Sequence, residues 1–206
     1  LERLTVTDKY GSALKLTALG GGKYTFEMPA SQVNIQAVFV PEQLPFADVK
    51  PTDWFYEAVA YVYEHGLMDG VGSNRFAPNA STTRAMIVTI LWRLEGEPEA
   101  DDTMPFADVA ANTWYTEAVR WAAGEGIVEG YSETAFGPND PITREQLAAI
   151  LWRYAKYLEL DVSIGENTNI LSYTDAAEIS EYAIPALQWA CGAGILEGSN
   201  GSLSPR

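Results

Sequence analysis

The sequence has little of the chemistry that a nucleic-acid-binding protein or a metalloenzyme needs. It holds 13 basic against 28 acidic residues, a net charge of −15, and no basic cluster, which excludes phosphate-backbone binding. Cys191 is the only cysteine, so no internal disulfide forms, and its apolar sequence context predicts a buried, unreactive thiol. His65 is the only histidine, and its position before Gly66 predicts a helix cap rather than a metal ligand.

Long hydrophobic runs are also absent. No segment approaches the ~18 apolar residues of a membrane span. The chain opens at Leu1 without a charged-then-apolar leader, so we expect any signal peptide to lie outside these residues. Apolar residues nevertheless make up 47% of the chain, with six tryptophans, which is enough for a real core. The composition predicts a folded protein of one or two domains.

What the chain does contain is a repeat. Residues 45–93 and 105–153 align without a gap at an offset of 60, with 20 identical residues in 49 positions. A weaker third copy begins at Tyr173, keeps Trp189 and Gly198 as counterparts of Trp121 and Gly130, and reaches Arg206 before any second helix. We therefore assign repeats to about 45–100, 105–162 and 171–206.

Each repeat predicts two helices around a turn-rich segment. The first helix begins near Asp53 in the first copy and ends at Gly66, with Gly126 in the second copy, and the second helix opens at Thr83 or Thr143. The expected core positions are Phe55, Val59, Val62, Tyr115, Val119 and Ala122 in the first helices, and Ile87, Ile90, Leu91, Leu94, Leu147, Ile150, Leu151, Tyr154 and Leu158 in the second. Such units expose apolar faces that only neighbouring units cover, so we expect the second helices to share a core.

Capping signals distinguish the copies. Thr143 and Gln146 predict a complete capping box, whereas Met86 in the first copy is expected to lose half of it. The third copy predicts one helix through Leu187 and Cys191, with Pro185 in its first turn. Its missing second helix leaves three alternatives: the chain continues past Arg206, another molecule supplies the helix, or the bundle stays open.

Residues 1–43 have a different pattern. Apolar residues alternate with polar ones around Val6, from Tyr24 to Met28 and from Val33 to Phe39, which predicts half-buried strands. Turns are expected at Gly20–Gly22 and at 29–31, which gives a small β hairpin or meander. Residues 41–43 read as a linker. Residues 24–39 resemble the last strands of the divergent B-repeat modules of surface proteins.

The repeated blocks F-A-D-V, W-x-x-x-A-V, G-[LI]-x-x-G, F-x-P, T-R and L-W-R at 45–206 resemble the S-layer homology (SLH) module. The resemblance implies a mainly α fold, a pseudo-threefold helical SLH array over 44–206 with an incomplete third repeat. It also implies a secreted bacterial surface protein that binds secondary cell-wall polysaccharide, often pyruvylated, in grooves between repeats. The site residues it implies are Arg84, Arg144, Trp54, Trp114, Gly70, Val71, Gly130 and Tyr131.

Each implied residue has a structural alternative. Arg84 and Arg144 either offer a planar donor fork to a sugar carboxylate or form internal ion pairs with residues such as Asp48 or Asp108. Trp54 and Trp114 either stack on a pyranose ring or pack in the core. The other tryptophans, Trp92, Trp121, Trp152 and Trp189, are expected in the core, and Arg93 and Arg153 are expected to be structural.

Catalysis is not expected. Acidic pairs such as Asp101-Asp102 lie in linkers, where no scaffold holds two carboxylates in a glycosidase arrangement. The loops at Asp69-Gly70 and Asn139-Asp140 lack the EF-hand ligand pattern, so we expect neither metal nor cofactor. The first hypothesis is a non-catalytic wall anchor. The alternative is a protein-interaction scaffold, which takes up a helix from another chain or self-associates through the third repeat. A third is a dependent part of a surface enzyme.

Overall fold

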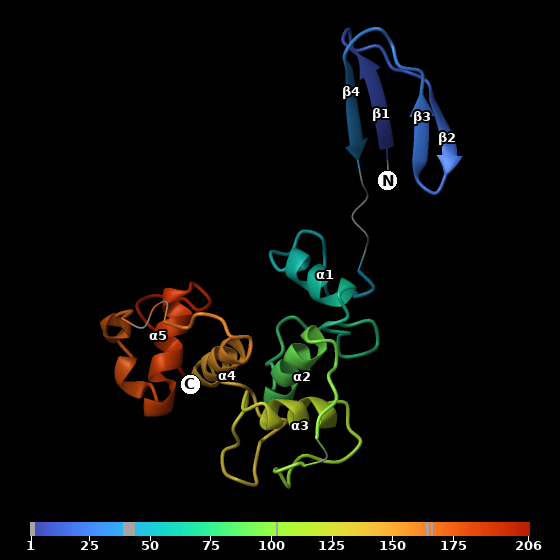
Figure 1. Cartoon of the computed structure of the whole chain (residues 1–206). Coiled ribbons are helices and arrows are strands. Elements are labelled where there is room, and N and C mark those ends of the chain that lie inside the picture. The colour runs from blue at the N-terminus through green and yellow to red at the C-terminus, as the bar shows by residue number, and fades with distance from the viewer. Residues whose placement is uncertain (1–2, 39–43, 102, 164, 166) are drawn as a thin grey trace.

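A computed structural model describes residues 3–38, 44–101, 103–163, 165 and 167–206, and its elements are mainly helical (Figure 1). The strands are β1 (Arg3–Asp8), β2 (Leu16–Gly20), β3 (Lys23–Phe26) and β4 (Val33–Val38). The α-helices of these residues are α1 (Tyr56–Glu64), α2 (Arg84–Leu94), α3 (Thr116–Gly124), α4 (Arg144–Tyr157) and α5 (Ile184–Gly192), with short 3-10 turns η1 (Ile170–Ser172), η2 (Ala176–Glu178) and η3 (Glu181–Ala183). Among them, no helix is long and apolar enough to cross a membrane.

The N-terminal strands form two antiparallel pairs. β2 turns into β3 through Gly21 and Gly22, and β1 pairs with β4, so the predicted strands and turns are confirmed. The predicted half-burial is wrong: Val6 is the only buried side chain described in 3–38, and Ile35 is 58% exposed. The reason is that each sheet has only two strands, and a two-stranded sheet offers too little surface to bury the side chains on its faces. Phe39 and the predicted linker 41–43 lie outside the described residues.

The first helices begin later than the sequence suggested. α1 starts at Tyr56 rather than at Asp53, because Asp53 instead closes a turn in which its carboxylate accepts the Lys50 N–H at 2.7 Å. The predicted glycine ends are confirmed, since Gly66 and Gly126 both have positive φ just after the helix. The His65 ring hydrogen-bonds the Tyr61 carbonyl at 2.8 Å and caps α1, as predicted.

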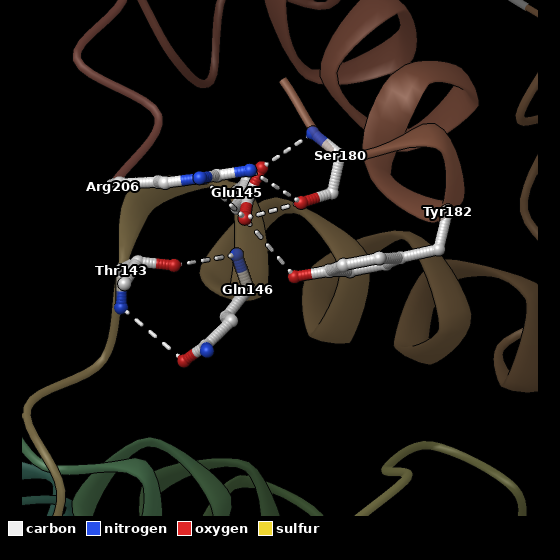
Figure 2. Close-up of polar contacts among 6 residues, drawn as sticks. All are labelled: Thr143, Glu145, Gln146, Ser180, Tyr182 and Arg206. Carbon is white, nitrogen blue, oxygen red and sulfur yellow. Dashed lines mark hydrogen bonds and ion pairs between the residues drawn. The ribbon is translucent and has the colours of Figure 1, made fainter. Parts of the chain in front are cut away.

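The second helices begin where the sequence placed them. Thr143 Oγ1 accepts the Gln146 N–H at 3.3 Å, and the Gln146 side chain accepts the Thr143 N–H at 3.4 Å, which completes the capping box (Figure 2). The prediction that the first copy loses half of its capping box is wrong. The Met86 sulfur lies 3.5 Å from the Thr83 nitrogen and takes the place of the amide oxygen, although sulfur is a weak acceptor.

Each second helix packs against the first helix of the next repeat. α2 packs against α3, and α4 packs against α5 (Figure 1). Val88 of α2, Trp121 of α3 and Ile150 of α4 lie in one buried cluster, so the expected sharing of a core by α2 and α4 is confirmed. The interior is nevertheless divided, because α5 packs with Ala148, Ala149 and Ala155 of α4 in a second cluster, and α1 packs with its own repeat in a third.

The buried face of the second helices is displaced from the predicted one. Ala85, Val88 and Leu91 are the buried apolar residues of α2, while Leu94 at its end is 50% exposed. Leu158, just after α4, is 38% exposed. Alanines at the helix crossings allow the two helices to approach closely. The predicted face was wrong because an apolar pattern gives alanine less weight than the larger side chains beside it. The expected core role of Trp92, Trp121, Trp152 and Trp189 is confirmed, with Trp121 and Trp189 buried and the other two packed against a core.

Candidate functional site

Three loops follow the first helices, and an aspartate holds each one. We call residues 69–80, 129–140 and 197–205 the first, second and third loops. Asp108 accepts the N–H groups of Phe136 and Gly137, both at 2.8 Å, and Asp48 and Asp175 do the same in the first and third loops. The hydrogen bond from Phe76 is the main reason that the pKa of Asp48 lies below its usual value. The aspartate of the F-A-D block therefore fixes the conformation of the loop in its own repeat by hydrogen bonds.

Glycine opens each loop because a ring packs on it. A Cβ at Gly70 would lie 2.6 Å from the Arg75 carbonyl oxygen and 2.8 Å from the Phe46 ring, and one at Gly130 would lie 2.6 Å from the Phe106 ring. Gly70 also has φ +80°, in the region that favours glycine. Two of the predicted site residues, Gly70 and Gly130, thus shape their loops.

Arg84 joins the first repeat to the second loop. It is 4% exposed, and its Nε and Nη2 donate to the carbonyls of Phe136 and Glu129, both at 2.8 Å. Its guanidinium also lies over the rings of Tyr131 and Phe136, at 4.7 and 4.6 Å from their centres. Burial lowers the pKa of Arg84, yet a guanidinium remains protonated at any working pH.

Arg144 makes the same connection one repeat later. Its Nε donates to the Leu203 carbonyl at 2.8 Å and its Nη2 to the Glu197 carbonyl at 2.6 Å, both in the third loop. The alternative of ion pairs with Asp48 or Asp108 is not seen among the described residues, where Arg84 and Arg144 donate to backbone carbonyls instead. Arg84 thus connects the first repeat to the second, and Arg144 connects the second to the third, both through backbone carbonyls.

A cavity of about 480 Å³ lies between the first loop, α2 and the start of the second repeat. Its lining includes the predicted residues Gly70, Val71 and Trp114, and adds Arg93 and Ile90 from α2. Trp114 is 56% exposed, and its ring lies nearly perpendicular to that of Tyr115, with the ring centres 5.0 Å apart. The core-packing alternative is therefore wrong for Trp114, and its indole is open to solvent at this cavity.

The other predicted residues lie elsewhere. Trp54 is 93% exposed, so core packing is wrong for it too, and it does not line the cavity. Tyr131, the counterpart of Val71, is 54% exposed beside Arg84 in the second loop. The structure thus joins three of the eight predicted residues, Gly70, Val71 and Trp114, at one cavity. It brings Arg84 and Tyr131 together at the second loop instead.

Arg93 is the cation of this cavity, and sequence reasoning assigned it a structural role. Its Nη1 lies 2.9 Å from an Asp69 carboxylate oxygen and 3.1 Å from the Leu67 carbonyl. Arg153, its counterpart, pairs with Glu129. An available signal was the acidic residue before the loop glycine in both repeats, Asp69 or Glu129, because it pairs with the arginine of L-W-R.

Tyr182 stands in the third repeat where Trp114 stands in the second. It is 50% exposed, and its hydroxyl lies 3.4 Å from Glu145, a buried carboxylate that the Ser180 N–H and hydroxyl also contact, at 2.9 and 3.0 Å (Figure 2). Burial and this carboxylate raise the pKa of Tyr182. No group of three or more histidine, cysteine or acidic residues in the described parts of the chain is placed to hold a metal.

Residues 45–85 and 105–148 match the family model of the S-layer homology domain. These two repeats are S-layer homology domains. It is 34% identical over 163 residues to an endoglucanase of Bacillus sp. (strain KSM-635), and 34% identical over 144 residues to the surface-layer 125 kDa protein of Lysinibacillus sphaericus. It is 26% identical over 144 residues to the cellulosome-anchoring protein of Acetivibrio thermocellus.

These matches cover 79%, 69% and 66% of this chain but only 17%, 12% and 32% of the respective relatives. The SLH repeats are therefore a segment that these relatives share, although the relatives as whole proteins differ. Domains of this family anchor surface proteins at the cell wall. Since the matched part is so small a share of the endoglucanase, the match to that relative does not carry its activity.

Proposed function

We propose that this chain is a non-catalytic module that binds secondary cell-wall polysaccharide and so holds the protein it belongs to on the outside of a bacterium. The observation that carries the proposal is the open indole of Trp114 at a cavity between two SLH repeats, with the guanidinium of Arg93 in the same lining. An indole face suits the C–H face of a pyranose ring, and a guanidinium suits its polar or acidic substituents.

The ligand we propose is an acidic saccharide, for which a pyruvate ketal is the simplest carboxylate. Arg93 is already paired with Asp69 at 2.9 Å, so a ligand carboxylate would replace that partner rather than meet a bare cation. The net charge of −15 opposes an acidic polymer at long range. Screening over about 8 Å at physiological salt leaves the local arginine dominant.

The remaining predicted residues receive proposed roles from their positions. Arg84 and Arg144 hold the second and third loops in place, and Gly130 lets Phe106 pack beneath the second loop. Tyr131, with Tyr182 and Arg153, is proposed to line a second, differently shaped saccharide groove. We also propose that residues 44–206 form a pseudo-threefold array, preceded by the small β segment. In that array Trp54 would line a third saccharide groove, which a further second helix would complete.

Wall pull-down tests the proposal. Purified cell wall should retain the wild-type chain, and Trp114→Ala should weaken retention at least tenfold, which is about 1.4 kcal/mol. Tyr10→Ala is the control, because that ring is 80% exposed just after β1 and does not line the cavity. Failure of the wild type to bind wall would reject the function. Equal binding by wild type and Trp114→Ala would reject the site while leaving the function standing.

A further inference from the structure

The helices α2 and α4 begin with caps of the same shape but of different chemistry. The backbone of the capping threonine is alike in both, with φ −89° and ψ 163° at Thr83 and φ −82° and ψ 161° at Thr143. The Thr143 N–H donates to the amide oxygen of Gln146 at 3.4 Å (Figure 2). The Thr83 N–H instead has the Met86 sulfur at 3.5 Å. The first cap therefore has a thioether where the second has an amide.

The Met86 sulfur is a poor partner for this N–H, because a thioether accepts hydrogen bonds only weakly. Within the described ranges the Thr83 N–H forms no other hydrogen bond, and Thr83 is half-buried, which limits its access to water. An acceptor oxygen at the same place would complete the capping box as glutamine does. It would also lie close to the positive end of the helix dipole, which favours partial negative charge.

Met86 is accessible to small reagents. Its side chain is half-buried and lines the cavity of about 480 Å³ beside the first loop. The cavity has room for a small oxidant and for one added oxygen atom. A polar group at this position is compatible with the fold, because the counterpart Gln146 is half-buried as well.

Methionine sulfoxide has nearly the shape of glutamine. Each side chain has two methylene groups followed by a branched centre, which carries an oxygen and an NH₂ group in glutamine and an oxygen and a CH₃ group in the sulfoxide. Oxidation thus turns an apolar side chain into a polar one with an acceptor oxygen. With a slight withdrawal of the Met86 side chain toward the cavity, this oxygen takes the place that the Gln146 oxygen has in the second cap.

We propose that Met86 is an oxidation site for hydroperoxides, and that its sulfoxide strengthens the cap of α2. The sulfur lone pair attacks the distal oxygen of the hydroperoxide, and the O–O bond breaks as the S–O bond forms. The proton of that oxygen passes to the leaving oxygen, which departs as water when the reagent is hydrogen peroxide. The sulfur loses two electrons and the peroxide gains them. Sulfoxide reductases restore the thioether, so the change is reversible.

The other three methionines lack this arrangement. Met28 is 65% exposed, Met68 is half-buried in the lining of the same cavity, and Met104 packs against the cluster shared by α2, α3 and α4. No hydrogen bond to any of their sulfurs is formed in the part of the chain that the structure describes. Because an oxygen on Met68 would replace no existing hydrogen bond in that lining, Met68 is the matched control.

The test uses two variants of the full chain. One keeps only Met86, through Met28→Leu, Met68→Leu and Met104→Leu, and the other keeps only Met68. Leucine is close to methionine in volume, so the fold should persist. Hydrogen peroxide should convert Met86 to the sulfoxide in the folded chain, as peptide mass spectrometry records.

Amide exchange at Thr83 reads out the cap. After oxidation of Met86 it should slow by about three- to tenfold, since a strong acceptor replaces a weak one. The two methionine sulfoxide reductases, one for each epimer, should return it to the original rate. Oxidation of Met68 should leave it unchanged. A slowing there as well would assign the effect to the cavity in general and overturn the role of the cap.

Two other results also overturn the proposal. One is a Met86 that reacts only after the chain is unfolded in urea, and the other is a Thr83 N–H that exchanges as fast or faster after oxidation. Met86→Gln in the otherwise unchanged chain is a second check, which needs no leucine replacements. It should slow exchange at Thr83 to a similar degree, and no slowing would show that an acceptor oxygen does not strengthen this cap. None of these outcomes depends on saccharide binding.

Discussion

The guanidinium carbon of Arg84 lies 4.6 Å from the ring centre of Phe136, 52 residues later in the chain. With the two carbonyl hydrogen bonds at 2.8 Å, this contact makes Arg84 the principal polar connection between the first and second repeats. The same geometry at Arg144 and the third loop shows that the connection is a rule of the array. A residue that the family resemblance points to as a sugar ligand thus has a structural task first.

Arg84→Ala should destabilise the protein by about 2 to 4 kcal/mol, because it leaves the carbonyls of Phe136 and Glu129 without this donor and opens a gap against two rings. Arg84→Lys should recover only part of this, since one ammonium cannot bridge both carbonyls as the planar fork does. Urea unfolding followed by tryptophan fluorescence measures the change. The control is Arg75→Ala, whose side chain is 65% exposed with a carboxylate at 3.6 Å and should shift stability by less than about 1 kcal/mol. An Arg84→Ala protein as stable as the control would contradict this role.

Gly130→Ala and Gly124→Ala should change stability in opposite directions. A methyl group at Gly130 would meet the carbonyl oxygens of Ala135 and Ser132 and, at 2.6 Å, the Phe106 ring, so the loop and the ring must shift at a cost of about 1 to 3 kcal/mol. Gly124 ends α3 with nothing within 4 Å of its virtual Cβ, so alanine there should stabilise the helix by up to about 1 kcal/mol. Thermal unfolding of the two variants checks the signs, and a neutral Gly130→Ala would mean that the ring does not pack on the glycine.

The third loop should loosen in acid. Hydrogen bonds from the Ser202 hydroxyl, and from the N–H groups of Leu203 and Ser204, lower the pKa of Asp175 from 3.8 to about 2. Because the folded pKa is the lower one, the ionised carboxylate stabilises the loop above about pH 4, and this stabilisation is lost as the pH falls toward about 2.

Amide exchange at Leu203 and Ser204 follows the loosening. Protection should fall between about pH 4 and pH 2 after correction for the intrinsic exchange rate. Asp175→Asn cannot ionise, so its protection should lack this pH dependence and start from a lower level. Identical pH profiles for the wild type and Asp175→Asn would show that the carboxylate does not hold the loop.

Local signals made much of this fold predictable. The openings at Thr83 and Thr143 and the glycine ends depend on contacts within a few residues, so they can be read from spacing alone. The strands of 3–38 can be read from local apolar alternation, although β1 pairs with β4 at the other end of the segment. The destination of Arg84 could not be read, because its partners are backbone carbonyls, which any residue supplies. The one available hint was that the third repeat keeps F-x-P as Leu203 and Pro205 even though its own second helix is absent.

The candidate site was only partly predictable for a related reason. Trp54 and Trp114 occupy the same position in their repeats, yet of the two only Trp114 lines the cavity of about 480 Å³, since the second repeat has the first loop beside it. Arg93 was assigned by its favourable place at a helix end, which is correct for the helix dipole. That reasoning does not reveal that the side chain also reaches the first loop.

Glu145→Ala should destabilise the third repeat more than the first two repeats. The Glu145 carboxylate is 5% exposed on α4 and accepts the N–H and the hydroxyl of Ser180, with the Arg206 guanidinium 3.9 Å away (Figure 2). Its removal leaves the Ser180 groups without that acceptor, which should cost about 2 to 4 kcal/mol. Amide exchange should accelerate in residues 176–206, with little change in α3.

Two further variants separate the hydrogen bonds from the packing of the side chain. Glu145→Gln keeps one acceptor oxygen and the volume, so it should retain about half of the protection of Glu145. Ser180→Ala removes only the hydroxyl, and in the Glu145→Ala background it should add little, because the two changes delete the same contact. Fully additive losses in this double-mutant cycle would show that Glu145 stabilises the third repeat by other means than Ser180.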